Sequence, residues 1–316
     1  MTGIERPVRA AVVGVGHLGR HHARILAELP GVHLVGVVDL NRARATEIAD
    51  ICGTQAIAEA SSLPGQVEAV VVATPTASHD AVAVPLLNAG IAVLVEKPIA
   101  RTLAEADAIV QAARANGAIL AVGHTERFNP AVQAARERLT TPRFIEVHRL
   151  GTFPDRSLDI DVVFDLMIHD LDVILSIVES RVAAIDAVGV PVLTPKFDIA
   201  NVRLRFESGC IANLTASRIS RDRTRKIRFF QPDSYVSVDY AAQELEVWRL
   251  VRPATGLPVI EGGVVPVTNE EPLKCELLDF IDAVRNRRMP LVTGENGRRA
   301  LALAQQITDA MISTRS

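Results

Sequence analysis

The sequence predicts an α/β protein in which a doubly wound parallel sheet is followed by an α+β domain with a large, mostly antiparallel open sheet. Short, nearly all-apolar runs alternate with helical patterns between residues 8 and 124, as expected for parallel strands buried on both faces. Beyond residue 124, helical patterns are followed by alternating, strand-like segments. The chain has 316 residues, more than one hydrophobic core usually serves. We therefore expect a first domain over 1–123 and a second over 124–316.

The first domain is expected to consist of βαβ units. Its apolar, largely β-branched runs are at 8–13, 34–38, 69–73, 92–95 and 119–122. Helical patterns fill the intervals, and several of them end at glycine or Asn-Gly, a common helix C-terminal signal. These helices are expected at 18–29, 41–52, 81–89 and 103–116.

The second domain begins with helical patterns at 130–139 and 160–178. Strands are expected to include 200–206, 211–216 and 244–250, where polar and apolar residues alternate. Proline and glycine predict hairpins or loops over 251–272, and amphipathic helices are expected at 275–287 and 295–312. Whether the last helix packs back on the first domain is left open. We expect this domain to bind substrate and to make the contacts of a homodimer or homotetramer, because an uncovered sheet face marks an interface.

Composition indicates a small-molecule ligand. A net charge of -3, with 48% hydrophobic and 22% charged residues, is ordinary for a soluble protein and gives no reason to expect nucleic acid or a membrane as a partner. Cys52, Cys210 and Cys275 lack the spacing of a zinc site or disulfide framework, so we interpret them as reduced core thiols. No apolar run reaches the ~20 residues that span a bilayer. No signal peptide is recognised, and a cytoplasmic protein is expected.

A glycine-rich turn joins the first strand to the first helix and predicts a dinucleotide site. The first glycine allows the tight turn, the second lets the backbone approach a pyrophosphate, and the third lets the helix pack on the strand. The N-H groups at the helix N-terminus face the diphosphate charge. An aspartate 20 residues past the last glycine ends the second strand, where it can bind ribose hydroxyls. The predicted cofactor residues of this Rossmann-type turn are Gly14, Gly16, His17, Leu18, Gly19 and Asp39.

The aspartate also bears on the choice of cofactor. A carboxylate at position 39 repels a 2′-phosphate, so NAD is expected rather than NADP. Arg42 leaves the choice less clear, because it could pair with that phosphate or lie on the outer face of its helix.

Three further motifs resemble the Gfo/Idh/MocA family of sugar and cyclitol dehydrogenases: VATPTASHD at 72–80, VEKP at 95–98 and GHTERFNP at 123–130. The resemblance covers essentially the whole chain. It implies further cofactor contacts from Thr74, Pro75, His79, Glu96 and Lys97. The last two would lie near the nicotinamide, and Lys97 would also reach the substrate.

The matching motif of the second half is DVVFDLMIHDLDVI at 161–174. Its helical spacing puts Asp165, His169 and Asp172 on one face. The resemblance implies an active site of Lys97, Asp165 and His169. The family often has glycine where this chain has Met167, which bears on how closely the helix approaches the nicotinamide ring.

These residue types suit oxidation of a secondary alcohol. His169 is the preferred general base, since an unperturbed histidine pKa of about 6.5 fits that task. Lys97 can stabilise the developing negative charge on oxygen, although a desolvated lysine could itself be the base. Asp165 would orient or tune the other two. No metal site is predicted, although a metal-binding interpretation of His169, Asp170 and Asp172 is conceivable.

Other polar residues have ordinary interpretations. Asp170 and Asp172 are expected to be solvated or paired structural carboxylates. His21 and His22 are expected to face the surface of the first helix, with nearness to the diphosphate as the alternative. The basic run 218–228 fits a solvated sheet face or a subunit contact better than nucleic-acid binding.

Within the family, the chain most resembles the branch whose members oxidise C3 of UDP-N-acetylglucosamine before its amination in lipid A synthesis. The stretch 143–161 is expected to line the substrate pocket, and Arg149, Arg156 or the basic run could bind the diphosphate. The predicted substrate-binding residues are Arg127, Arg156, Asp165 and His169. An inositol or free-sugar dehydrogenase is the first alternative, and a non-catalytic NAD-responsive regulator is the second.

Overall fold

The computed structural model describes residues 6–153 and 160–313. The chain forms two compact units, one of Met1–His124 with Leu273–Arg298 and one of Thr125–Pro272 with Arg299–Ser316. The segment Leu273–Arg298 thus belongs to the unit built by the N-terminal half, which the sequence did not indicate. The assignment of residues 1–123 to cofactor binding and of residues 124–316 to substrate binding stays a prediction.

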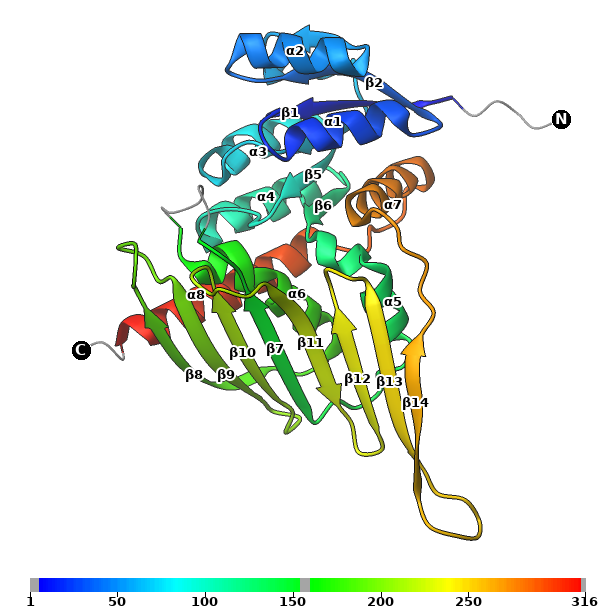
Figure 1. The fold of residues 1–316 in the computed structure, drawn as a ribbon. Helices are drawn as coiled ribbons and strands as arrows, with labels where there is room; N and C mark the ends of the chain where they lie inside the picture. The colour runs from blue at the N-terminus through cyan, green and yellow to red at the C-terminus, as the bar shows by residue number, and fades with distance from the viewer. Residues whose placement is uncertain (1–5, 154–159, 314–316) are drawn as a thin grey trace, which may run out of the picture. The chain divides into compact units, whose positions relative to one another are not determined.

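The first unit contains a fully parallel sheet with the strand order β3-β2-β1-β4-β5-β6 (Figure 1). Its strands are β1 (Val8–Val13), β2 (Val32–Val38), β3 (Gln55–Ile57), β4 (Ala69–Val72), β5 (Ala92–Glu96) and β6 (Leu120–Gly123). Its helices are α1 (Gly19–Glu28), α2 (Arg42–Cys52), α3 (His79–Asn88), α4 (Leu103–Ala115) and α7 (Pro272–Asn286). The predicted doubly wound parallel sheet is confirmed. The sequence missed only β3 among these strands, because three residues are too short for a pattern.

Local signals explain where the helices begin and end. The side chain of Asn41 accepts a hydrogen bond from the backbone N-H of Arg44, and α2 ends at Gly53 with φ +63°. Thr102 caps α4 in the same way, through the N-H of Glu105. These caps satisfy backbone groups that a helix end leaves without partners.

The second unit is built on an eight-stranded sheet with the order β14-β13-β12-β11-β7-β10-β9-β8. Its strands are β7 (Phe144–Leu150), β8 (Val182–Val190), β9 (Ile199–Phe206), β10 (Ile211–Ser217), β11 (Thr224–Phe230), β12 (Ser234–Asp239), β13 (Glu244–Val251) and β14 (Val259–Val265). Only β7 and β10 pair in parallel. The mostly antiparallel sheet is therefore confirmed, and β13 with β14 forms the hairpin expected in 251–272.

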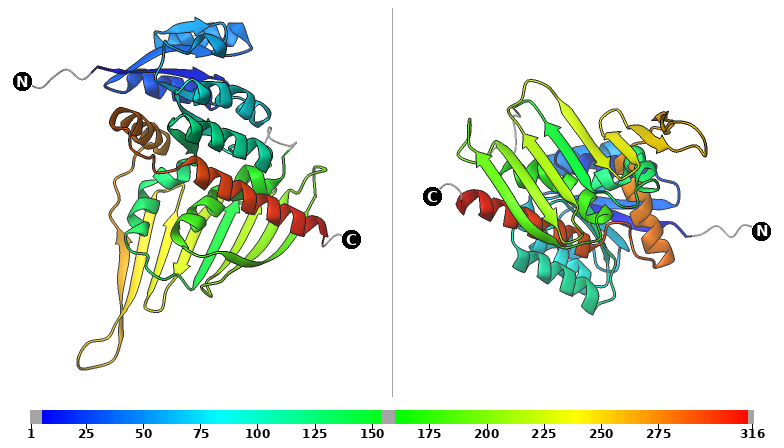
Figure 2. Two further views of the ribbon diagram at one scale, coloured as in Figure 1. Left: turned by 180° about the vertical axis from the view of Figure 1, so that it is seen from behind. Right: turned by 90° about the horizontal axis from the view of Figure 1, so that it is seen from below.

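Helices cover one face of this sheet, as Figure 2 shows from behind. They are α5 (Pro130–Arg136), α6 (Ile168–Ile177) and the part of α8 (Gly294–Ser313) that belongs to this unit. In β7 and β9 every second side chain is buried, so the buried residues pack under the helices and the others lie on the opposite face. No described helix combines the length and apolarity needed to cross a membrane.

Candidate functional site

The turn after β1 requires glycine at two of its three glycine positions. Gly14 has φ +87°, and a Cβ there would lie 2.7 Å from the backbone of Ala73. A Cβ on Gly19 would lie 1.7 Å from the carbonyl oxygen of Gly14. A Cβ on Gly16, by contrast, would meet only Nη1 of Arg44, at 3.6 Å. The turn is therefore closed toward the protein and open at Gly16, as a pyrophosphate-binding turn requires.

Asp39 lies at the end of β2 and is held by the backbone. Its Oδ2 accepts the N-H of Val15 at 2.9 Å, and its Oδ1 accepts the N-H of Asn41 at 2.8 Å. The arginine beside this carboxylate is Arg44, whose Nη1 lies 3.7 Å from Oδ2. Arg42 is exposed, which agrees with the alternative that it lies on the outer face of its helix, and no ion pair with Asp39 is found for it among the described residues.

The motif after β4 is tied to the motif after β5 by His79. This side chain is buried, with Nε2 3.0 Å from the carbonyl oxygen of Thr74 and Nδ1 3.1 Å from that of Pro98. Burial lowers the pKa of His79, although the carbonyl contacts oppose this. Ser78 Oγ donates to the carbonyl oxygen of Pro75 at 2.8 Å. His79 thus connects the loop after β4 to the loop after β5. Cofactor contacts of Thr74, Pro75 and His79 stay predictions.

Glu96 ends β5 with a buried side chain. Its Oε1 lies 2.7 Å from Nε2 of His22, and its Oε2 accepts the N-H of Lys97 at 3.1 Å. Burial alone would raise the pKa of Glu96, but the His22 hydrogen bond and the Lys97 charge bring it below its ordinary value. His22 is fully buried, so the expectation that it faces the helix surface is wrong. Cofactor contacts of Glu96 and the half-buried Lys97 stay predictions.

His17 and Leu18 are exposed in the glycine turn, and the ring of His17 meets that of His21 edge-on at 6.0 Å. Both positions are open to a ligand. Their contact with the cofactor also stays a prediction.

In the second unit, a π-helical turn, Val163–Met167, leads directly into α6. Asp165 lies in this turn and His169 in the first turn of α6, and both side chains are half-buried. π turns within helices occur frequently at functional sites. Asp172 is buried instead and pairs with Arg127 at 3.5 Å.

The residue after His169 is held by a buried ion cluster. Arg149 on β7 donates from Nε and Nη2 to the carboxylate of Asp170 at 2.6 and 2.9 Å, and from Nη1 to Glu126 at 3.0 Å. Its guanidinium also lies 4.8 Å from the ring centre of Tyr240. Burial opposes the charge of Arg149, but its carboxylate partners outweigh this and raise its pKa. The pairs of Asp170 with Arg149 and of Asp172 with Arg127 confirm the expectation that both are paired carboxylates. The Arg149 pairs also occupy the donors that this side chain would need for a diphosphate.

The predicted substrate-binding arginines have different outcomes. Arg127 is buried, with 4% of its surface exposed, and pairs with Asp172. Burial lowers its pKa despite that pairing. Arg156 lies outside the described residues. Substrate contact remains a prediction for both.

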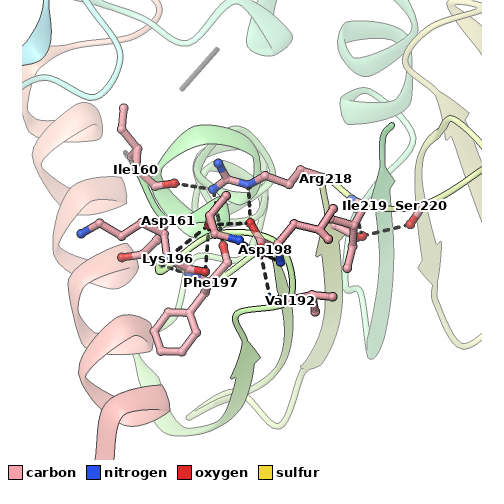
Figure 3. A network of polar contacts seen from close by, with 12 residues as sticks. Ile160, Asp161, Val192, Lys196, Phe197, Asp198, Arg218, Ile219 and Ser220 are labelled. Atoms are coloured by element: carbon pink, nitrogen blue, oxygen red, sulfur yellow. Dashed lines mark hydrogen bonds and ion pairs between the residues drawn. The ribbon is translucent and has the colours of Figure 1, made fainter. Parts of the chain in front are cut away.

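A second network, which the sequence did not predict, anchors the chain just before the π turn (Figure 3). Arg218 is 1% exposed and donates from Nη2 to the carbonyl oxygen of Ile160. Its Nε lies 3.7 Å from Oδ1 of Asp198. Asp198 Oδ2 in turn accepts backbone N-H groups, including that of Val192 at 2.8 Å. Asp161 accepts the N-H of Phe197 at 2.8 Å, so both residues that start this segment are fixed.

The basic run suggested that Arg218 lies on a solvated sheet face. The structure shows instead that this side chain is buried. For the rest of the basic run a solvated sheet face fits better, because buried and partly exposed side chains alternate along part of β11. Lys226 pairs with Asp239 at 3.2 Å, and Arg228 with Glu146 at 2.7 Å, on partly exposed side chains.

Comparisons with known proteins cover both units. A family model described as an oxidoreductase family with an NAD-binding Rossmann fold matches residues 8–124, and the GFO/IDH/MocA C-terminal domain matches residues 132–232. The chain is 39% identical over 306 residues to UDP-N-acetylglucosamine 3-dehydrogenase of Acidithiobacillus ferrooxidans, which covers 96% of this chain and 97% of that protein. A solved structure of that enzyme matches with a TM-score of 0.90, 39% identity and the same coverage.

More distant relatives share the fold. The scyllo-inositol 2-dehydrogenase (NAD(+)) of Bacillus subtilis is 28% identical over 237 residues, 69% of each chain. Levoglucosan dehydrogenase, solved in complex with NADH and levoglucosan, has a TM-score of 0.85 over 98% of each chain, at 18% identity that shows the fold alone. The chain therefore belongs to the Gfo/Idh/MocA family of oxidoreductases, with an NAD-binding Rossmann domain in its first unit.

Proposed function

We propose that this oxidoreductase oxidises the C3 hydroxyl of UDP-N-acetylglucosamine with NAD⁺ as hydride acceptor. The observation that carries the proposal is the similarity to the Acidithiobacillus ferrooxidans enzyme along nearly the whole length of both chains. Similarity confined to the Rossmann domain would support only the cofactor. The second half, which would bind the sugar, is included.

The first unit fits a bound dinucleotide. The open side of the turn at Gly16 leaves room for a diphosphate, and Asp39 has lone pairs left for ribose hydroxyls. We propose NAD rather than NADP, because Asp39 repels a 2′-phosphate. Thr74, Pro75, His79 and Lys97 would line the same cofactor.

The chemistry is assigned to Lys97, Asp165 and His169. His169 takes the hydroxyl proton as hydride leaves carbon, because imidazole is the side chain best suited to general-base work at physiological pH. Lys97 holds the oxygen and stabilises its developing negative charge. Asp165 orients this pair. Bound NAD⁺ supplies the hydride acceptor.

Several finer points belong to the same proposal. The substrate would also contact Arg127 and Arg156. The oxidation would prepare the sugar for amination in lipid A synthesis, and the enzyme would be cytoplasmic.

We further propose a homodimer or homotetramer that uses the uncovered face of the second sheet. Light scattering coupled to size-exclusion chromatography tests this, and a monomer at all concentrations would contradict it.

Initial rates of NADH formation test the substrate. UDP-N-acetylglucosamine, myo-inositol and simple hexoses are compared at equal concentrations with NAD⁺. We expect turnover with the nucleotide sugar and little with the others. Turnover only with an unphosphorylated polyol would instead support an inositol or free-sugar dehydrogenase.

A further inference from the structure

Three ionisable side chains meet in the core of the first unit, next to the Glu-Lys-Pro motif. His22 comes from α1, Glu96 from the end of β5 and Glu276 from α7, and they are 0, 5 and 2% exposed. One ligand atom from each lies within 4.8 Å of the others. The surrounding core is otherwise largely aliphatic. Burying such groups is costly unless they are paired, so this cluster calls for a role beyond filling space.

The contact between His22 and Glu96 is a direct hydrogen bond. At 2.7 Å, the Nε2 and Oε1 atoms leave no room for a metal ion between them. Nδ1 of His22 has no hydrogen-bond partner among the described residues. The proton therefore belongs on Nε2, which donates to Glu96.

The other oxygen of Glu96 connects this bond to Lys97. Oε2 accepts the backbone N-H of Lys97 at 3.1 Å. The carboxylate thus links helix α1 to the backbone of the proposed catalytic lysine. A buried carboxylate oxygen that loses its donor is costly, so the His22 hydrogen bond helps to fix where Glu96 lies.

Strand β6 leaves space for this arrangement. A Cβ on Gly123 would lie 3.0 Å from Oε2 of Glu96 and 3.1 Å from its Cδ. That is closer than such contacts normally are. Glycine at this position therefore keeps free the volume in which the carboxylate sits.

We propose that His22 is a positioning residue for Lys97. It holds Glu96, and Glu96 holds the backbone of Lys97 through its N-H group. This inference rests on the proposed role of Lys97. It adds a residue of the cofactor-binding helix, outside the motifs assigned to chemistry.

Replacement of His22 by two different residues tests the proposal. His22→Ala removes the donor, and we expect kcat to fall about 10- to 100-fold, as misplacement of a catalytic group does, while the Kd for NADH changes less than about threefold. His22→Gln places an amide donor where Nε2 lies, so it should recover most of kcat. Initial rates give kcat and KM, and NADH fluorescence titration gives Kd. Ile281→Val, a conservative core substitution on α7, is the matched control and should leave kcat unchanged.

Gly123→Ala provides an independent perturbation, because it crowds the same carboxylate and leaves His22 in place. It should lower kcat as His22→Ala does. The proposal is overturned if His22→Gln loses as much kcat as His22→Ala, or if Ile281→Val has the same effect. Full turnover by Lys97→Ala would instead contradict the proposed function, so the two failures are distinguishable.

Discussion

Asp39 is held as an acceptor by its own backbone surroundings. Each of its oxygens accepts one backbone N-H, from Val15 and from Asn41, and keeps a lone pair for a ribose hydroxyl. Arg44 lies 3.7 Å away with a side chain that is 46% exposed, so it can turn toward a phosphate. The proposed preference for NAD therefore depends on the charge of Asp39, and not on the lack of a nearby cation.

Asp39→Ser should shift this preference toward NADP. The ratio of kcat/KM for NADP⁺ to that for NAD⁺ should rise about tenfold or more, the effect of relieving about 1.4 kcal/mol of repulsion. Initial rates with both cofactors measure it. In the Asp39→Ser background, Arg44→Ala should reverse the gain, whereas the exposed Arg42→Ala should not. Equal effects of the two would contradict the role given to Arg44.

At the scale of elements, the segment with Asp165 and His169 is fixed from two sides. Arg149 of β7 binds Asp170, directly after His169. Arg218 binds the carbonyl oxygen of Ile160, ahead of the π turn. Such support matters for the proposed roles of Asp165 and His169, because loss of alignment of a catalytic side chain lowers the rate.

Arg149→Met should destabilise the protein by about 3–5 kcal/mol, because it leaves the carboxylates of Asp170 and Glu126 buried without their cation. Urea unfolding measures this difference. Arg203→Met removes an exposed arginine of β9 and serves as the control. A loss no larger than that of the control would show that the buried pair does not stabilise the unit.

The stabilisation from Asp198 should depend on pH. Burial would raise its pKa, but the N-H groups of Leu193 and Thr194 lower it below the ordinary value. A carboxylate whose pKa is lowered by folding stabilises fully above its unfolded pKa of about 3.9, and loses that contribution as the pH falls through the folded pKa.

Asp198→Asn should therefore cost stability at pH 6, and the difference from the unaltered protein should shrink below about pH 4. Denaturant unfolding at several pH values measures it. A difference that stays constant from neutral to acid pH would mean that the charge of Asp198 contributes nothing.

At the scale of the whole molecule, the sequence predicted what depends on local pattern. Nearly all-apolar runs located β1 and β4, and the glycine spacing located the turn at Gly14, because these features are set by neighbouring residues. The edge strand β3 was missed because it has only three residues.

Contacts between distant parts of the chain could not be predicted in this way. His22 looks like a surface residue in its helix, yet it is buried against Glu96, 74 positions along the chain. Glu276 reaches the same cluster on α7, a helix whose place in the first unit no local pattern indicates. Arg218 is part of a basic run and is nevertheless buried. In each case the burial of the side chain depends on a contact with a residue far along the chain, which the local sequence does not reveal.

The proposed reaction transfers a hydride from C3 of UDP-N-acetylglucosamine to NAD⁺, with Lys97 and His169 in the active site. The most direct measurement is NADH formation from this substrate, with the product identified by NMR, for the unaltered enzyme and for Lys97→Ala and His169→Ala. We predict one NADH for each 3-keto sugar formed, and rates lowered by at least about 100-fold in both variants. Oxidation at another position, or unchanged turnover in either variant, would contradict the proposed function.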